Sequence, residues 1–475
     1  MNDSEIIAKL NYVTNDILLP VTAIQTNEDK ENARKKEYSP DFTEQEWRER
    51  FPRLPAEKIY YLPGLNLGMV YYDIEKIVYL NLGIYNGQIF SAPTQVDSEY
   101  EELILDAIKT EEEYTKQKEY AHVLSGMPDG LRMEAVRQIL KLEGPTPYFY
   151  DTFMEEYTTA EFSAEILPTD IVDVLLKSKS EEQKKETQQR LDEAFPNMDT
   201  IPVFRGMADK STAPDKAFSW SPDINVAMFF ATHLGEYGKV LEGTVSKKDI
   251  IEYFCPEHNK GTEHEVFVRP GSVVVNNTTL MYAMDENEIH EAIGATQHLY
   301  RDKAKSLQQL YLNKKASEHD CMHSLRVLFL SLLIGALEEC TSEELQRIAE
   351  AAIYHDCGRT DDGENDTHGT AAARIYKNRG GKNKMVAFAI TAHCMDDDRV
   401  QQMIRHKFPE SARQTVWRIV SILKDADALD RVRFGFSGAS PAPDGLDVNF
   451  LRNKSSLRLV GIAQKACLYL EMPHD

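Results

Sequence analysis

The sequence is poor in the features that mark disulfide-rich secreted proteins and membrane proteins. Six cysteines are spread over 475 residues without a CxxC pair, which argues against a disulfide framework and a structural zinc finger. The most apolar run, Val327 to Leu337, is shorter than the roughly 20 residues that span a bilayer. We therefore predict that this run forms a buried core helix and that the chain has no membrane span.

Positive charge is also scarce. The chain has 54 Lys and Arg against 77 Asp and Glu, a net charge of −23, so its surface repels phosphates on average. This charge argues against general binding to nucleic acid or anionic membranes and leaves room for a local pocket that takes one nucleotide. The N-terminus has no basic segment followed by an apolar one, so we expect no signal peptide. The predicted location is the cytoplasm, or the outside of the cell for an effector secreted by a non-classical route.

The pattern of apolar residues predicts a multidomain α+β protein with three regions. Residues 1–95 end in a stretch rich in Tyr, Ile and Val with turn signals, which predicts a small β element of unknown function. Residues 96–285 begin with helical periodicity and continue with strand-like pieces such as TIPVFRGM and EVFVRPGSVVV, so we expect a mixed α/β domain. Residues 286–475 are helical almost to Ile422, which predicts an all-α domain.

Three strand-like pieces of the middle region carry polar residues where apolar ones are expected. These residues are Arg205 with Gly206 after it, Ser219 and Ser221 on one strand face, and Glu263 and Glu265 on another. Arginine offers a rigid fork of donors that suits a diphosphate. A carboxylate can hold a ribose hydroxyl and stabilise an oxocarbenium-like centre. Together these groups suit a site that splits nicotinamide from NAD.

The order of these residues resembles the R-S-E class of mono-ADP-ribosyltransferases, in which an Arg, a Ser-Thr-Ser motif and a Glu-x-Glu motif lie on successive strands. Trp220 stands where that family has Thr, which is a departure. The resemblance implies that NAD is a substrate, with Glu265 catalytic and Glu263 activating or selecting a protein or nucleic-acid acceptor. It also implies that NAD is bound by Arg205, Gly206, Ser219 and Ser221.

A second polar set lies in the helical region. Six of the 13 histidines fall between His319 and His406, and the spacing of His319 and His323 places both on one helix face. Polar residues at the ends of apolar helices are costly to bury unless something satisfies them. Imidazole and carboxylate groups both bind divalent metal ions, so this set predicts a metal centre. The polar residues at these helix ends are His319, His323, His355, Asp356, His368, His393, Asp425, Asp427 and Asp430.

This second set resembles the HD-domain metal-dependent phosphohydrolases, which carry the pattern H…HD…D on a helical bundle. The resemblance implies one or two divalent ions, either Mn, Mg, Fe or Zn, with Asp356 at the catalytic centre. It implies that one ion is held by His323, the pair His355 and Asp356, and Asp427, with His368 and His393 as further ligands of a second. His319 and Asp425 are weaker candidates. The substrate is then a nucleotide or an ADP-ribosyl phosphoester.

The two sets predict a bifunctional enzyme that transfers ADP-ribose from NAD to a macromolecule and hydrolyses phosphoesters, including its own ADP-ribosyl product. SidE-type bacterial effectors resemble it in concept, since they combine ADP-ribosyl transfer with a phosphodiesterase to make phosphoribosyl-linked ubiquitin. Two alternatives stay open. One is an HD nucleotide phosphohydrolase with a non-catalytic nucleotide-binding module. The other is a non-catalytic binding protein. The bifunctional enzyme would suit a bacterial effector or toxin.

Overall fold

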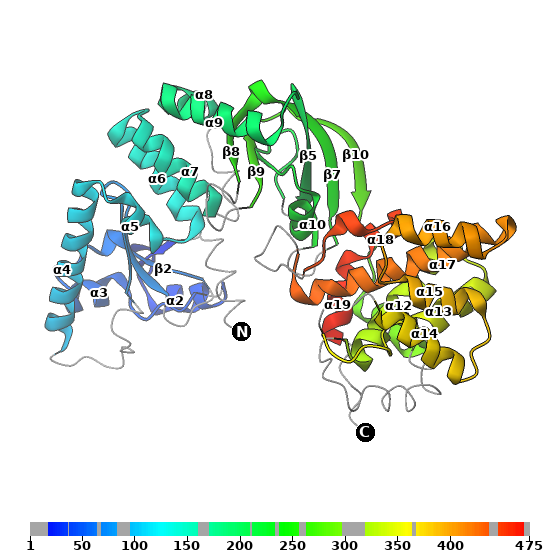
Figure 1. Ribbon diagram of the computed structural model, residues 1–475. Helices are drawn as coiled ribbons and strands as arrows, with labels where there is room; N and C mark the ends of the chain where they lie inside the picture. The colour runs from blue at the N-terminus through cyan, green and yellow to red at the C-terminus, as the bar shows by residue number, and fades with distance from the viewer. Residues whose placement is uncertain are drawn as a thin grey trace. The chain divides into compact units, whose positions relative to one another are not determined.

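The computed structural model divides the chain by its contacts into two compact units, Met1–Gln189 and Arg190–Asp475 (Figure 1). This division falls inside the predicted domain 96–285, and the boundaries near residues 95 and 285 stay predictions. Among the described residues, no helix is both long enough and apolar enough to cross a membrane. The structure describes residues 18–36, 38–63, 68–82, 96–159, 171–209, 211–232, 237–255, 263–296, 319–362, 367–436 and 445–469.

The first unit contains a small antiparallel sheet where the sequence predicted a β element. The sheet has the order β1-β2-β3-β4 and packs on a core that includes Trp47, Phe51 and Ile59. Capping boxes at Thr26 and Thr43 start the helices α2 and α3. The elements are β1 Leu19–Pro20, η2 Val21–Ala23, α2 Asn27–Arg34, α3 Glu44–Arg50, η3 Ala56–Lys58, β2 Ile59–Tyr61, β3 Met69–Asp73 and β4 Val78–Asn81.

The helical periodicity that follows the β element also produces helices, as the sequence predicted. The helices from α4 onward are amphipathic, and α8 buries Ile171, Val172 and Leu175. They are α4 Val96–Gln117, α5 Tyr120–Ser125, α6 Asp129–Glu143, α7 Pro147–Thr159, α8 Ile171–Ser178 and α9 Glu181–Ala194.

Two three-stranded antiparallel sheets form the strand-rich part of the second unit. One has the order β10-β7-β5 and the other β6-β9-β8. They meet where the backbone N–H of Phe204 donates to the Ser221 carbonyl at 2.6 Å and the N–H of Ser221 donates back at 2.9 Å. The strands are β5 Thr200–Met207, β6 Ser219–Trp220, β7 Lys239–Ser246, β8 Ile250–Phe254, β9 Glu265–Val268 and β10 Val274–Leu280, with η7 Lys247–Asp249 before β8.

The helix α10 (Ile224–Thr232) packs directly on β5 at Gly206. A Cβ atom at Gly206 would lie 1.9 Å from the Ala227 carbonyl oxygen and 2.6 Å from the Ala231 nitrogen, so only glycine allows this approach. Val226 of this helix is buried, whereas Phe230 is 46% exposed. The structure thus gives Gly206 a packing role, and its contact with NAD stays a prediction.

The C-terminal helices gather into one bundle (Figure 1). The apolar run from Val327 to Leu337 lies in α12 and is mostly buried, which confirms the predicted core helix. The elements are α12 Cys321–Leu337, α13 Ser342–Tyr354, α14 His368–Asn378, α15 Lys384–Ala392, α16 Asp397–Lys407, α17 Glu410–Leu429, η8 Asp430–Phe434, η9 Val448–Phe450, α18 Lys454–Arg458 and α19 Val460–Tyr469.

The start of α12 corrects one expectation about the histidines. The side chain of Asp320 accepts a hydrogen bond from the His323 backbone N–H and caps the helix, so His319 lies just outside it. The two residues therefore do not share a helix face. Their rings still pack, with centroids 5.4 Å apart.

The bundle and the strand-rich part of the second unit share one hydrophobic core. Met228 and Ala231 of α10 belong to the same buried cluster as Val460 of α19. Asn225 supports this junction, since its Oδ1 atom accepts from the Val448 N–H at 2.8 Å and its Nδ2 atom donates to Asp447 at 3.0 Å. The second unit is therefore mixed α/β with a helical C-terminal region, as predicted at that level.

Gly206→Ala is expected to destabilise the second unit by about 1–3 kcal/mol, because the added methyl group collides with the backbone of α10. Thermal or urea unfolding measures the loss. Gly294→Ala is the matched control, since a methyl group there meets nothing within 4 Å. Equal stability of the two variants would contradict the close packing of α10 on β5.

Candidate functional site

The predicted metal ligands converge at the ends of five helices. His323 lies in the first turn of α12, His355 follows α13, His368 starts α14 and His393 follows α15. Asp356 lies among them, and Asp427 lies near the end of α17. The four histidines and Asp356 are each at most 5% exposed, whereas the Asp427 side chain is 32% exposed. Asp427 therefore marks the side of the cluster that is open to solvent.

The two carboxylate oxygens of Asp356 face two different pairs of imidazoles. Oδ1 lies 3.2 Å from Nε2 of both His368 and His393. Oδ2 lies 3.5 Å from Nε2 of His323 and 3.8 Å from Nε2 of His355. One buried carboxylate thus stands between two sets of nitrogen donors.

His323 and His355 form the first pair, and the lone pairs on their Nε2 atoms face each other. Nδ1 of His323 lies 2.8 Å from Asp430 and Nδ1 of His355 lies 2.7 Å from the Ala352 carbonyl, and both partners are acceptors. These partners assign the ring hydrogen to Nδ1 and leave Nε2 as an acceptor in the neutral ring. The two Nε2 atoms lie only 3.1 Å apart. Asp427 Oδ1 lies 3.3 Å from Nε2 of His323. Protons on the rings or one bound cation can satisfy this concentration of acceptors.

In the second pair, His368 and His393, one ring is fixed in the same way. Nδ1 of His393 lies 2.8 Å from the Ile390 carbonyl, so its Nε2 is also an acceptor. That atom lies 2.9 Å from Nε2 of His368. Hydrogen bonds that fix ring tautomers in this way are typical of the residues behind metal ligands. The residues therefore fit a divalent metal centre.

The carboxylates of the cluster are held in their ionised form. Burial raises the pKa of Asp356, but with protonated rings around it the positive charge of His355 and hydrogen bonds from the other three histidines outweigh burial and hold the pKa well below its usual range. A metal ion bound to the neutral rings would supply this positive charge in place of the ring protons. The pKa of Asp427 is lowered in the same way by His323 and His355. Ionised carboxylates are the form that binds metal ions.

The sequence analysis assigned no role to Asp430 or Arg326. Asp430 is 1% exposed and accepts from His323, from two nitrogens of Arg326 and from Arg433 at 2.6 Å. It therefore orients the His323 ring, while the two arginines balance its charge. The signal in the sequence was the third aspartate after Asp425 and Asp427, but spacing alone could not distinguish a ligand from a supporting residue.

The two weaker candidates lie outside the pairs of facing imidazoles. Asp425 is buried and accepts from Arg452, Asn453 and Ser456, so it joins α17 to the start of α18. His319 lies at the rim, with Nδ1 3.0 Å from Asp362 and its side chain 17% exposed. Residues 363–366 of the acidic loop lie outside the described residues.

The Arg-Ser-Glu residues also come together, at the place where the two sheets meet. Nη1 of Arg205 donates to the Ser219 carbonyl at 2.6 Å, and Ser221 Oγ donates to the His264 carbonyl at 2.6 Å. Burial raises the pKa of Glu265, while a hydrogen bond with the Ser219 hydroxyl and the charge of Arg205 lower it in part. Three residues from β5, β6 and β9 thus share one site.

Glu263, next to this site, has an unusual protonation equilibrium. Burial and the neighbouring Glu265 raise its pKa from 4.5 to about 7. A carboxyl group whose pKa is higher in the folded protein than in the unfolded chain lowers stability as pH rises between the two values. Such a group can act as a proton donor or acceptor near neutral pH.

Glu263→Gln is expected to raise the melting temperature relative to the unmodified chain at pH 8. The difference is expected to vanish below about pH 4.5, where Glu263 is protonated in both the folded and the unfolded state. Calorimetry at the two pH values measures the difference, with the exposed Glu242→Gln of β7 as the control. The same increase in melting temperature at both pH values would show that the raised pKa of Glu263 does not cause the increase.

The comparisons with known proteins agree with the metal cluster. Residues 321–432 match the family model described as HD domain. The searches of the curated proteins and of the solved structures gave no match. The matched segment contains all six predicted metal ligands and no residue of the Arg-Ser-Glu cluster. The chain thus contains an HD domain, which indicates a metal-dependent phosphohydrolase.

Proposed function

We propose that the protein hydrolyses a phosphoester at a divalent metal centre built on Asp356. The observation that carries this proposal is that the two oxygens of Asp356 face two separate pairs of imidazole nitrogens. One ion would be held by His323, His355, Asp356 and Asp427, and a second by Asp356, His368 and His393. A bound divalent ion supplies a water of lowered pKa and a positive charge for a phosphoryl oxygen.

The residues around the cluster support this chemistry by position and charge. Arg359 lies at the rim, with Nε 3.1 Å from Asp356 Oδ2 and its side chain 14% exposed. It fixes the carboxylate and adds local positive charge to an otherwise acidic chain. The half-buried His319, aligned by Asp362, stands at the same rim. A phosphoester would approach from this side, where Asp427 is accessible.

Asp356→Asn is expected to lower the hydrolysis of bis-p-nitrophenyl phosphate in the presence of Mn²⁺ by at least about 100-fold, because a metal ligand is lost. Asp361→Asn, in the exposed loop that follows, is the control and should keep the activity. Metal analysis of both proteins tests the cause. Full hydrolysis by Asp356→Asn, or hydrolysis that survives complete removal of metal, would exclude this centre.

We propose NAD-dependent ADP-ribosyl transfer as a second function. The specific observation in its favour is that Arg205, Ser219 and Glu265, which come from three strands, meet at one site. Arg205 would hold the NAD diphosphate, and Glu265 would hold a ribose hydroxyl and stabilise the oxocarbenium-like centre. Glu263, with a pKa of about 7, would accept a proton from the acceptor.

The common core of the second unit supports a connection between the two functions. Asn225 follows Ser221 by four residues and forms hydrogen bonds with Asp447 and Val448, in the segment that continues from the HD region. The product of ADP-ribosyl transfer contains a diphosphate, which is a class of substrate for a metal phosphohydrolase. A SidE-like sequence of the two reactions and a non-catalytic nucleotide-binding role of the strand-rich part are the competing interpretations.

Glu265→Gln is expected to abolish the release of nicotinamide from NAD and leave the hydrolysis of bis-p-nitrophenyl phosphate unchanged. The amide keeps the shape of the carboxylate, so the fold and the hydrolysis are preserved. It removes the negative charge that would stabilise the oxocarbenium-like centre, so only the release of nicotinamide is lost. Chromatography of the nicotinamide measures it, with Glu242→Gln as the control. Absence of nicotinamide release from the unmodified chain, over a panel of protein and nucleic-acid acceptors, would favour the non-catalytic interpretation.

A further inference from the structure

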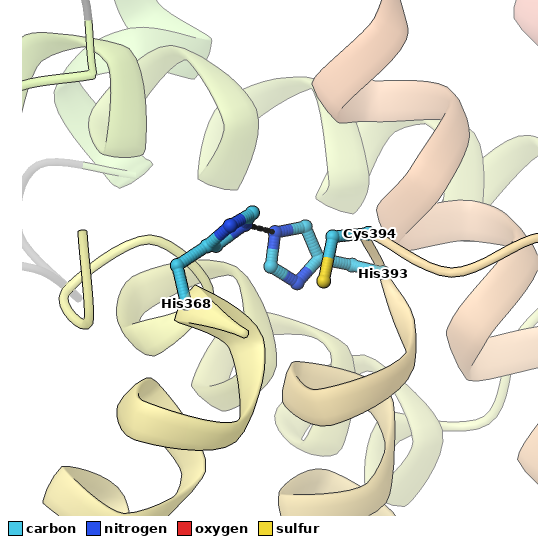
Figure 2. Close-up of side chains that lie close together, drawn as sticks. All are labelled: His368, His393 and Cys394. Atoms are coloured by element: carbon cyan, nitrogen blue, oxygen red, sulfur yellow. Dashed lines mark hydrogen bonds between the residues drawn. The ribbon is translucent and has the colours of Figure 1, made fainter. Parts of the chain in front are cut away.

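Cys394 lies beside the second pair of imidazoles, His368 and His393. The HD pattern H…HD…D does not include this cysteine. The donor atoms of His368, His393 and Cys394 all lie within 4.8 Å of one another (Figure 2). We propose that Cys394 is a thiolate ligand of the second metal subsite and makes that subsite select zinc, while the first subsite takes a harder ion. This inference rests on the proposed metal centre and names the metal that one half of it takes.

The donor set around Cys394 suits a tetrahedral ion. Nε2 of His368 and Nε2 of His393 lie 2.9 Å apart, and each lies 3.2 Å from Asp356 Oδ1. Tetrahedral zinc, with Zn–N bonds of about 2.0–2.1 Å, places neighbouring ligand atoms roughly 3.3 Å apart. The two nitrogens and the sulfur form one group of candidate donors, and Asp356 Oδ1, next to both nitrogens, would supply the fourth ligand that zinc prefers.

The local fold brings these donors together. The helix α15 ends at Ala392, so His393 and Cys394 are consecutive residues at its C-terminal end. The helix α14 approaches that end closely because its second residue is Gly369. A Cβ atom there would lie 2.7 Å from the Ile390 carbonyl oxygen and 3.0 Å from Cys394 Sγ. The absence of a side chain at Gly369 therefore allows the His368 ring and the Cys394 thiol to share one space.

The two subsites differ in the softness of their donors. The first group contains His323, His355 and Asp427, with imidazole nitrogens and a carboxylate oxygen and without sulfur. Carboxylate and water ligands suit Mg²⁺ and Mn²⁺, whereas a thiolate selects zinc over both. Asp356 is common to the two subsites, so it would join ions of different kinds.

Cobalt(II) reports on this sulfur directly, because a thiolate bound to cobalt gives an intense charge-transfer absorption in the near ultraviolet. We expect the metal-free full-length chain to develop this absorption on addition of Co²⁺. We expect Cys394→Ser to lose it. Cys340→Ser is the matched control, since Cys340 is also a half-buried cysteine just after a helix and belongs to none of the candidate metal groups of the described residues. It should keep the absorption.

Metal analysis after equilibration with equal Zn²⁺ and Mn²⁺ gives a second readout. The unmodified chain and Cys340→Ser should retain about one zinc per chain, and Cys394→Ser should lose most of it. Circular dichroism checks that all three proteins are folded. Cobalt bound without charge-transfer absorption, or an absorption that Cys394→Ser retains, would exclude the thiolate ligand. It would leave the proposed metal centre itself in place. A chain that binds neither cobalt nor zinc would overturn the metal centre itself.

Discussion

The arrangement of the helical bundle depends on one buried carboxylate, that of Asp356. A charge that is 1% exposed is costly unless it is compensated, and here four imidazoles and Arg359 surround it. The compensation requires that the ends of several helices meet at one point. The bundle thus has to bring these helix ends together, and the apolar faces of the helices supply the free energy that holds them there.

A further set of polar residues fixes the histidines behind this point. Asp430 holds the His323 ring, and the carbonyls of Ala352 and Ile390 hold His355 and His393. Each of these partners is an acceptor, so each ring turns its Nε2 lone pair toward the centre. The result is a site in which the side chains are oriented before a ligand arrives, which reduces the free-energy cost of binding an ion.

The second unit combines this centre with the Arg-Ser-Glu cluster through a continuous core. The helix α10 packs on β5 at Gly206 on one side and belongs to the same buried cluster as α19. Asn225 adds hydrogen bonds to the backbone of Val448 and the side chain of Asp447. The strands and the bundle are therefore parts of one compact unit, and a change in the packing of one can reach the other.

The sequence by itself determined most of the secondary structure and the residues of the candidate metal centre. An uninterrupted apolar run located the buried helix α12, and the strand-like piece TIPVFRGM located β5. The residue types of His323, His355 and Asp356 favoured metal binding. The sequence could not place His319 outside the helix, because a single cap at Asp320 decided that boundary. Only the tertiary structure gave Asp430 its supporting role, Asp425 its structural one and Cys394 its place beside two histidines. Those roles depend on which helix ends meet, and such contacts between distant residues leave no periodic signal in the chain.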